Sequence, residues 1–201
     1  MIRIPIKMSN FTKWENYPTW NYKKTHMVKY SAGILPYTFD RDGKCFFLLG
    51  KDNENDWSDF GGRCEFRDKS EPLNTATREF YEETLGAVHS VQECIDKLHM
   101  NPTRIISKTL NGSPYYMYLM YIENNNYNDT FIKTSNFLKY SYYQDKRMLY
   151  RLIEKNSIRW VSMDTILNCI ENGQRNAPIS LRGVFYNTLV SSKDQLQFLI
   201  K

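Results

Sequence analysis

Short runs of hydrophobic residues, several of them alternating with polar residues, occur along the chain, and each run predicts a β-strand. The runs are residues 28–39, 45–51, 103–110, 113–122 and 157–163. A turn around Gly43 separates the first two runs, and Asn111-Gly112 joins the next two, which is a strong signal for a hairpin. The sequence therefore predicts two antiparallel hairpins and one later strand.

Other segments carry hydrophobic residues at three- and four-residue spacing, which is the period of an α-helix. In one of them Leu73, Ala76 and Phe80 form an apolar stripe, with Ser70 as the expected N-cap and Pro72 in the first turn. Helices are also expected at residues 91–100, 142–155, 164–173 and 180–190, and a polar loop at residues 123–131. This order of elements predicts an α/β (α+β) fold, in which a mixed sheet is sandwiched between helices.

The chain of 201 residues is long enough for one domain with a sizeable core, or for one domain plus an extension. We expect a domain over residues 28–201 and an N-terminal extension over residues 1–27. The extension carries Trp14, Tyr17, Trp20 and Tyr22 among lysines. Packing of the extension on the core is the favoured interpretation, and a stacking surface for a base is the alternative.

Composition narrows the class of protein. Hydrophobic residues make up 41% of the chain and charged residues 24%, as in an ordinary soluble protein. The net charge of +5 suits an anionic ligand, but the chain has no dense basic run like that of a dedicated nucleic-acid-binding arm. It also lacks the G-x-x-x-x-G-K-[ST] and G-x-G-x-x-G motifs, which disfavours P-loop and Rossmann functions.

The cysteines and the apolar runs bear on location. The four cysteines are Cys45, Cys64, Cys94 and Cys169, and none stands in a C-x-x-C pair or at zinc-binding spacing. Four thiols of this kind indicate a reducing compartment. No apolar run reaches the roughly eighteen residues of a membrane span, and the N-terminus is too broken for a signal peptide. We therefore expect an intracellular, cytoplasmic protein without membrane association.

The stretch R-E-F-Y-E-E-T places three glutamates close together on the first predicted helix. Glu79, Glu82 and Glu83 are related as i, i+3 and i+4, so they share one helical face, and Arg78 stands four residues before Glu82. Most such faces are only solvated surface. Three carboxylates also make a good oxygen cage, because Mg²⁺ binds carboxylate and water oxygens and usually contacts substrate phosphate as well.

The segment W-S-D-F-G-G-R-C-E-F favours the metal-binding interpretation. Gly61 and Gly62 end a strand-like run and open the loop that leads into the glutamate helix, and glycine lets the backbone turn tightly and approach a ligand. The order strand, Gly-Gly, loop and glutamate helix resembles the Nudix hydrolases. Their signature is a glycine, five residues, a glutamate, seven residues and R-E-U-x-E-E-x-G-U, where U is aliphatic. The counterparts in this chain are Gly62, Glu71, Arg78, Glu79, Glu82, Glu83 and Gly86.

The match departs from the family signature in three places. The interval from Gly62 to Arg78 is two residues longer, and Ser70 holds the strict position of the first glutamate with Glu71 one residue late. The turn E-E-T-L-G is one residue longer than the usual E-E-x-G, and Phe80 replaces the aliphatic residue after Glu79. The R-E-x-x-E-E core is intact. The W-S-D-F-G-G and E-E-T-L-G segments are similar to those in Nudix proteins of large DNA viruses.

The resemblance implies roles for individual residues. Glu79, Glu82, Glu83 and the Gly61 carbonyl would bind Mg²⁺ or Mn²⁺, Arg78 would orient Glu82, and either Glu79 or Glu154 would accept a proton from water. Glu154 is a candidate because it stands six residues before Trp160, at a position where many Nudix proteins carry an acidic residue just before a late strand. The alternative for Glu154 is a solvated glutamate near a helix C-terminus.

Three functions are consistent with these residues. The first is hydrolysis of a nucleoside diphosphate linked to another moiety, with a nucleotide-type substrate. The second is cleavage of capped RNA, which the viral resemblance, the basic charge and the aromatic extension favour. The third is a Nudix-fold binding module without turnover, which is disfavoured because Glu79, Glu82 and Glu83 are all present.

Overall fold

The computed structural model describes residues 29–173 and 177–199. The predicted N-terminal extension therefore lies outside the described residues. The strands are β1 (Ser31–Phe39), β2 (Cys45–Asp52), β3 (Trp57–Ser58), β4 (Phe60–Arg63), β5 (Arg104–Lys108), β6 (Pro114–Tyr121) and β7 (Lys155–Ser162). They form one mixed sheet in the order β3-β2-β1-β6-β5, in which β4 also pairs with β1 and β7 also pairs with β2. All five strands predicted from the hydrophobic runs form, as β1, β2, β5, β6 and β7, and so do the two predicted hairpins.

The sheet opens between β1 and β2, and this opening positions the Gly-Gly segment. Strand β6 runs parallel to β1 from Ser31 to Tyr37, so β2 and β4 must share the other edge of β1. Strand β2 takes the end of that edge at Tyr37–Phe39, and β4 takes its beginning at Ser31–Ile34. Strands β3 and β4 therefore lie in the gap between the two long strands, which brings the glycines into the middle of the sheet.

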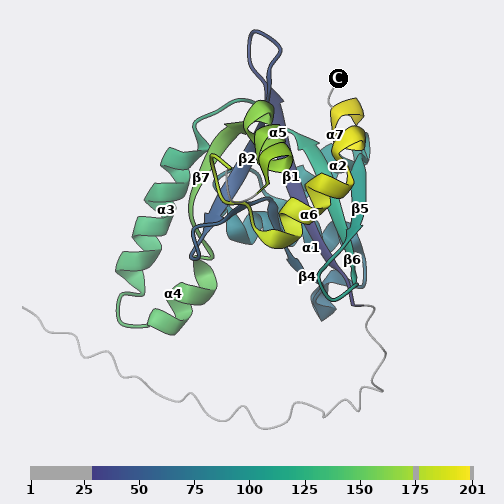
Figure 1. Cartoon of the computed structure of the whole chain (residues 1–201). Helices are drawn as coiled ribbons and strands as arrows, with labels where there is room; N and C mark the ends of the chain where they lie inside the picture. Colours follow the sequence, from purple (N-terminus) through teal and green to yellow (C-terminus); the bar gives the residue numbers. More distant parts are fainter. Residues whose placement is uncertain (1–28, 174–176, 200–201) are drawn as a thin grey trace, which may run out of the picture.

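Helices cover both faces of the sheet (Figure 1). They are α1 (Pro72–Glu83), α2 (Val91–Met100), α3 (Tyr127–Ser141), α4 (Lys146–Leu152), α5 (Met163–Asn172), α6 (Gly183–Ser191) and α7 (Lys193–Leu199). Side chains of α1, α2 and α3, such as Phe80, Leu98 and Phe131, fill one half of the core. Side chains of α5 and α6, such as Ile166 and Phe185, fill the other half. The predicted α/β (α+β) class, with a mixed sheet between helices, is confirmed.

Two predictions about helices were wrong. Residues 123–131, expected to be a polar loop, contain the start of α3, whose buried Phe131 and Ser135 lie four residues apart. The asparagines around Tyr127 conceal this stripe in the sequence. The helix expected at 142–155 is only α4, because Lys155 is already buried in β7, where it pairs with β2.

All four cysteines are thiols, because no disulfide joins any two of them. Burial raises the pKa of the Cys45 and Cys94 thiols to about 12. Within the described residues, no helix is both long and apolar enough to cross a membrane.

Candidate active site

Helix α1 packs its apolar stripe on the sheet and so fixes where its glutamates lie. The helix begins after Glu71, which is the N-cap in place of the predicted Ser70, and Pro72 occupies its first turn. Ala76 and Phe80 are fully buried, and the Phe80 ring meets the Phe60 ring of β4 edge-on, with centroids 5.3 Å apart. The C-terminal end of α1 is thereby held against β4, where the glycines are.

The three glutamates of α1 lie at three different depths. The side chain of Glu83 is 3% exposed, that of Glu79 is 13% exposed and that of Glu82 is 44% exposed. The shared helical face therefore runs from the interior of the protein to its surface. Each glutamate pairs with at least one basic side chain, and Arg78 serves both Glu79 and Glu82.

Glu83 is held in the interior by two donors. The Gly61 backbone N–H donates to Glu83 Oε2 at 2.8 Å, and Lys155 Nζ lies 3.3 Å from Glu83 Oε1. Lys155 is itself buried and donates to Ser58 Oγ at 2.8 Å. Burial raises the pKa of Glu83 to about 8, against the lowering effect of Lys155, and the charges of Glu79, Glu154 and Asp59 raise it further.

Glu79 lies directly over the Gly-Gly segment. A Cβ atom at Gly62 would collide with the Glu79 carboxylate, and one at Gly61 would lie 2.7 Å from the Gly33 Cα atom. Only glycine leaves room at these two positions. Burial raises the pKa of Glu79 to about 7 even though Arg78 acts in the opposite direction, and Glu82 and Glu154 add to the rise.

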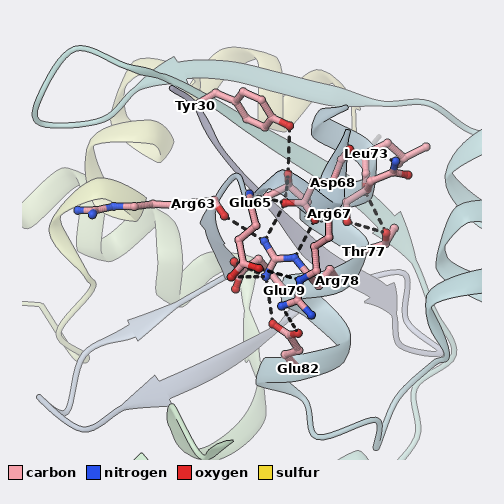
Figure 2. A network of polar contacts seen from close by, with 12 residues as sticks. Tyr30, Arg63, Glu65, Arg67, Asp68, Leu73, Thr77, Arg78, Glu79 and Glu82 are labelled. Carbon is pink, nitrogen blue, oxygen red and sulfur yellow. Dashed lines mark hydrogen bonds and ion pairs between the residues drawn. The ribbon is translucent and has the colours of Figure 1, made fainter. Parts of the chain in front are cut away.

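Arg78 is the centre of the polar network in Figure 2. It is buried, and its Nε and Nη2 atoms donate to the two oxygens of Asp68 at 2.8 and 2.9 Å, a bidentate pair. Its Nη2 atom also donates to the Arg63 carbonyl, and Nη1 donates to Glu79 Oε1 at 2.8 Å and Glu82 Oε2 at 3.0 Å. One guanidinium thus ties β4, the loop before α1 and two of the glutamates together.

Asp68 is the anchor of this network. It is 2% exposed and accepts hydrogen bonds from the Glu65 N–H and from Thr75 Oγ1 as well as from Arg78. Thr75 in turn is linked to the Tyr30 hydroxyl. Burial favours the neutral acid, but the hydrogen bonds from Arg78, Glu65 and Thr75 outweigh it and lower the pKa of Asp68.

Glu82 lies at the exposed end and is shared by two arginines. Arg67 Nη2 donates to Glu82 Oε1 at 2.8 Å, while its Nε atom donates to Glu65. The side chain of Arg67 is 58% exposed, so this pair is in contact with solvent, unlike the pair between Arg78 and Asp68.

Glu154 is exposed and stands between α4 and β7, next to the buried Lys155. Its negative charge raises the pKa of both Glu79 and Glu83, which places it within electrostatic reach of both carboxylates. The structure thus brings Glu79, Glu82, Glu83, Arg78, Gly61 and Glu154 into one region. Glu71 is not part of it, because it caps the opposite end of α1.

Asp59 is a further buried carboxylate close to Glu83. Asp59, on the segment between β3 and β4, accepts a hydrogen bond from the Tyr115 hydroxyl of β6. Burial raises the pKa of Asp59 to about 6 although Tyr115 lowers it. The negative charge of Asp59 also contributes to the raised pKa of Glu83.

Neither Asp68 nor Lys155 was predicted from the sequence. Asp68 stands six residues after Gly62, where the quoted signature has its first glutamate, so spacing counted from the glycine could have found it. Lys155 is one of many lysines. The nearest signal for Lys155 was its place beside Glu154, at the first inward-facing position of β7.

The oxygen donors at this site fit a hard divalent cation such as Mg²⁺ or Mn²⁺ in kind and in charge. Glu79 and Glu83 each carry a raised pKa to which neighbouring carboxylates contribute, and a cation would relieve that repulsion. Across residues 29–173 and 177–199, no three acidic, histidine or cysteine side chains are drawn together closely enough to enclose a metal ion. Arg78 and Lys155 compensate the carboxylates in this arrangement.

No protein-family model and no curated protein matches the chain. Similar solved structures include a Nudix hydrolase from M. smegmatis, with 11% identity over 84% of this chain and 86% of that one and a TM-score of 0.45. The Nudix domain of Shewanella oneidensis NrtR complexed with ADP ribose has 11% identity over 84% and 87% and a TM-score of 0.45. A MutT/nudix family protein from Enterococcus faecalis has 14% identity over 67% of this chain but only 43% of that one, with a TM-score of 0.38. Likenesses at TM-scores below 0.5 decide neither the family nor the activity of this chain.

Proposed function

We propose that the chain is a Nudix hydrolase that uses Mg²⁺ or Mn²⁺ to cleave a diphosphate linkage in a nucleoside diphosphate joined to another group. The observation that carries the proposal is the pair of carboxylates at the Gly-Gly segment, of which Glu83 is buried and Glu79 is 13% exposed. Glu79 and Glu83 lie one helical turn apart against β4, with pKa values raised to about 7 and about 8. A fold built only for stability has no reason to bury two like charges side by side.

The residues of the site divide the work. Glu79, Glu82, Glu83 and the Gly61 carbonyl would hold the metal, which when bound supplies charge neutralisation and lowers the pKa of water. Lys155 and the Gly61 N–H fix the Glu83 carboxylate, so its orientation is set before any ligand arrives.

Arg78 fixes the other two carboxylates. Its bidentate pair with Asp68 locks the guanidinium plane, and the remaining Nη1 atom then holds Glu79 and Glu82 at 2.8 and 3.0 Å. Arg78 is therefore a positioning residue.

The proton acceptor is either Glu79 or Glu154. The pKa of Glu79, about 7, matches the value expected of a general base that acts near neutral pH. Glu154 is exposed and lies within electrostatic reach of Glu79, so it can accept a proton from water that approaches from the open side.

A panel of substrates tests the proposal. The full chain is incubated with ADP-ribose, dinucleoside polyphosphates, nucleoside triphosphates and capped RNA, with Mg²⁺, Mn²⁺ or a chelator. We expect turnover of at least one diphosphate compound with metal and none with chelator. Glu82→Gln should lower the rate by about 10²-fold or more, whereas Glu171→Gln, an exposed glutamate of α5, should not change it. Binding without hydrolysis of every compound would show a non-catalytic module.

Capped RNA is the second candidate substrate. The specific observation in its favour is the accumulation of exposed aromatic and basic side chains on the helices that precede Glu154. Uncapped RNA of the same sequence is the control that separates cleavage of the cap from cleavage of the RNA chain.

A further inference from the structure

The outer part of the α3–α4 pair, residues 136–152, is a helical hairpin that stands away from the core. Helix α3 packs on β7 through Phe131 and Ser135 in its first half. Beyond residue 135 no residue of the hairpin is buried, and α4 has none at all. Figure 1 shows α3 and α4 on the outer side of β7, away from α5 and α6. The hairpin therefore exposes both of its helices.

The hairpin is unusually aromatic for an exposed element. Of the nine large aromatic side chains that are exposed among the described residues, five belong to it: Phe137, Tyr140, Tyr142, Tyr143 and Tyr150. Tyr140 is 83% exposed and Tyr150 is 71% exposed. A cluster of this kind is typical of an interaction surface rather than of ordinary solvent-exposed structure.

The hairpin is also basic. Its charged residues are Lys139, Asp145, Lys146, Arg147 and Arg151. None of the four basic side chains forms an ion pair with another described residue. Asp145 is occupied as the N-cap of α4, where it accepts a hydrogen bond from the Met148 N–H. The free charge of the surface is therefore positive.

Exposed aromatic rings beside unpaired basic side chains are the combination that binds single-stranded nucleic acid. Bases stack on the rings, and the phosphates meet the lysines and arginines. Met148 is the only exposed large aliphatic side chain of the hairpin, so nearly all of its large exposed apolar side chains are aromatic rings on which bases can stack. Four of the five rings are tyrosines, whose hydroxyls can also hydrogen-bond to the ribose 2′-hydroxyl of RNA.

The hairpin leads directly to the candidate active site. Helix α4 ends at Leu152, two residues before Glu154 and three before Lys155, the partner of Glu83. We propose that residues 136–152 bind single-stranded RNA, which continues from the 5′ end whose diphosphate linkage lies at the active site. The second part of this proposal rests on the proposed function, and the first part does not.

Binding of RNA without a diphosphate tests the first part alone. The probe is a fluorescein-labelled, 5′-hydroxyl RNA of roughly 16 nucleotides, the upper site size of a single-strand-binding fold. Fluorescence anisotropy with the full chain in the presence of a chelator measures affinity, so no hydrolysis is needed. We expect saturable binding that weakens steeply between about 50 and 200 mM salt.

Matched variants separate stacking from charge. The double variant Tyr140→Ala/Tyr143→Ala should weaken binding by about tenfold or more, whereas Tyr140→Phe/Tyr143→Phe, which keeps both rings, should retain most of it. Lys146→Gln/Arg147→Gln should reduce the slope of log affinity against log salt by about 1.4, or about 0.7 per phosphate contact.

The charge control is Arg41→Gln/Lys44→Gln. These two exposed residues lie in the β1–β2 turn, which rises at the top of Figure 1 while α4 lies at the lower left. This variant should bind RNA like the unmodified chain. Circular dichroism confirms that each variant is folded.

Several outcomes would overturn the proposal. One is no RNA binding by the unmodified chain, and another is equal loss in the control variant. Tighter binding of DNA than of RNA would reject RNA as the partner. Self-association that is lost in the tyrosine variants would assign the hairpin to a second copy of the chain. Failure of the hydrolase assay alone would leave the binding result standing.

Discussion

Replacing Arg78 by lysine tests whether the bidentate pair with Asp68 holds the site together. Lysine keeps the positive charge but can reach only one of the atoms that Nε, Nη1 and Nη2 contact. Asp68, at 2% exposed, would lose half of its charged pair, and the Arg63 carbonyl would lose its donor. Breaking a buried pair costs about 3–5 kcal/mol when the partner is removed entirely. Because lysine retains part of the interaction, we expect about 2–3 kcal/mol.

The matched control is Arg67→Lys. Arg67 also binds Glu82, and at 2.8 Å, but its side chain is 58% exposed where that of Arg78 is 10% exposed. An exposed ion pair contributes about 0–1 kcal/mol, so Arg67→Lys should hardly change the free energy of unfolding. Urea unfolding of the two variants and the unmodified chain measures the difference. In a domain of this size Arg78→Lys should lower the melting temperature by roughly 5–10 °C.

The pH dependence provides a second readout of the same interaction. The pKa of Asp68 is lowered in the folded state, so its carboxylate stabilises the fold above the ordinary value of 3.8. That contribution is lost as the pH falls through the lowered pKa. The difference in unfolding free energy between Arg78→Lys and the unmodified chain should therefore be largest at neutral pH and should decrease as the pH falls below 3.8. Equal unfolding free energies for the Arg78 and Arg67 variants at neutral pH would refute the reasoning.

Three further predictions concern the carboxylates. In thermal melts, millimolar Mg²⁺ or Mn²⁺ should stabilise the folded chain by about 2.7–4.1 kcal/mol at a hundred- to thousandfold excess over Kd, and a chelator should reverse this stabilisation. Glu82→Gln should reduce the stabilisation by the metal. Glu154→Gln should leave the melting temperature unchanged, because Glu154 is exposed, but lower the turnover rate; unchanged turnover would make it a solvated surface residue. Lys155→Met should destabilise the fold by about 1–3 kcal/mol because Glu83 and Ser58 lose a buried partner and the pKa of Glu83 rises further above about 8, and the double variant with Glu83→Gln should recover part of that loss in the same melts.

The fold was predictable where the evidence lies within a few neighbouring residues. The Asn111-Gly112 turn fixed the β5–β6 hairpin, and the stripe of Leu73, Ala76 and Phe80 fixed α1. Helix α3 was missed because Tyr127 follows a run of asparagines, and its stripe depends on how Phe131 packs on β7. Local patterns of this kind decide the type of element more reliably than its ends.

The site was predictable in part for the same reason. The three glutamates and Arg78 lie within six residues of one helix, so their common face follows from helix geometry alone. Asp68 was missed because the first glutamate was located by counting back from Arg78, whereas counting forward from Gly62 leads to Asp68. Lys155 could not be predicted, because it meets Glu83 only after the strand β7 has packed. The sequence also carries no measure of depth, which is what separates Glu83 from Glu82.

Depth explains how one helical face holds three carboxylates. Glu83 is compensated from inside by Lys155 and the Gly61 N–H, and Glu79 from the side by Arg78. Glu82 is compensated at the surface by Arg67 as well as Arg78. Each carboxylate therefore has at least one basic partner, with Arg78 shared by Glu79 and Glu82, and the repulsion between them does not have to be relieved by distance. In the proposed function, a metal ion that binds here would meet carboxylates already fixed by those partners, so little reorganisation would remain when charge develops during the reaction. Because the same partners compete with the metal for the carboxylate oxygens, they would weaken metal binding while they fix the orientation of its ligands.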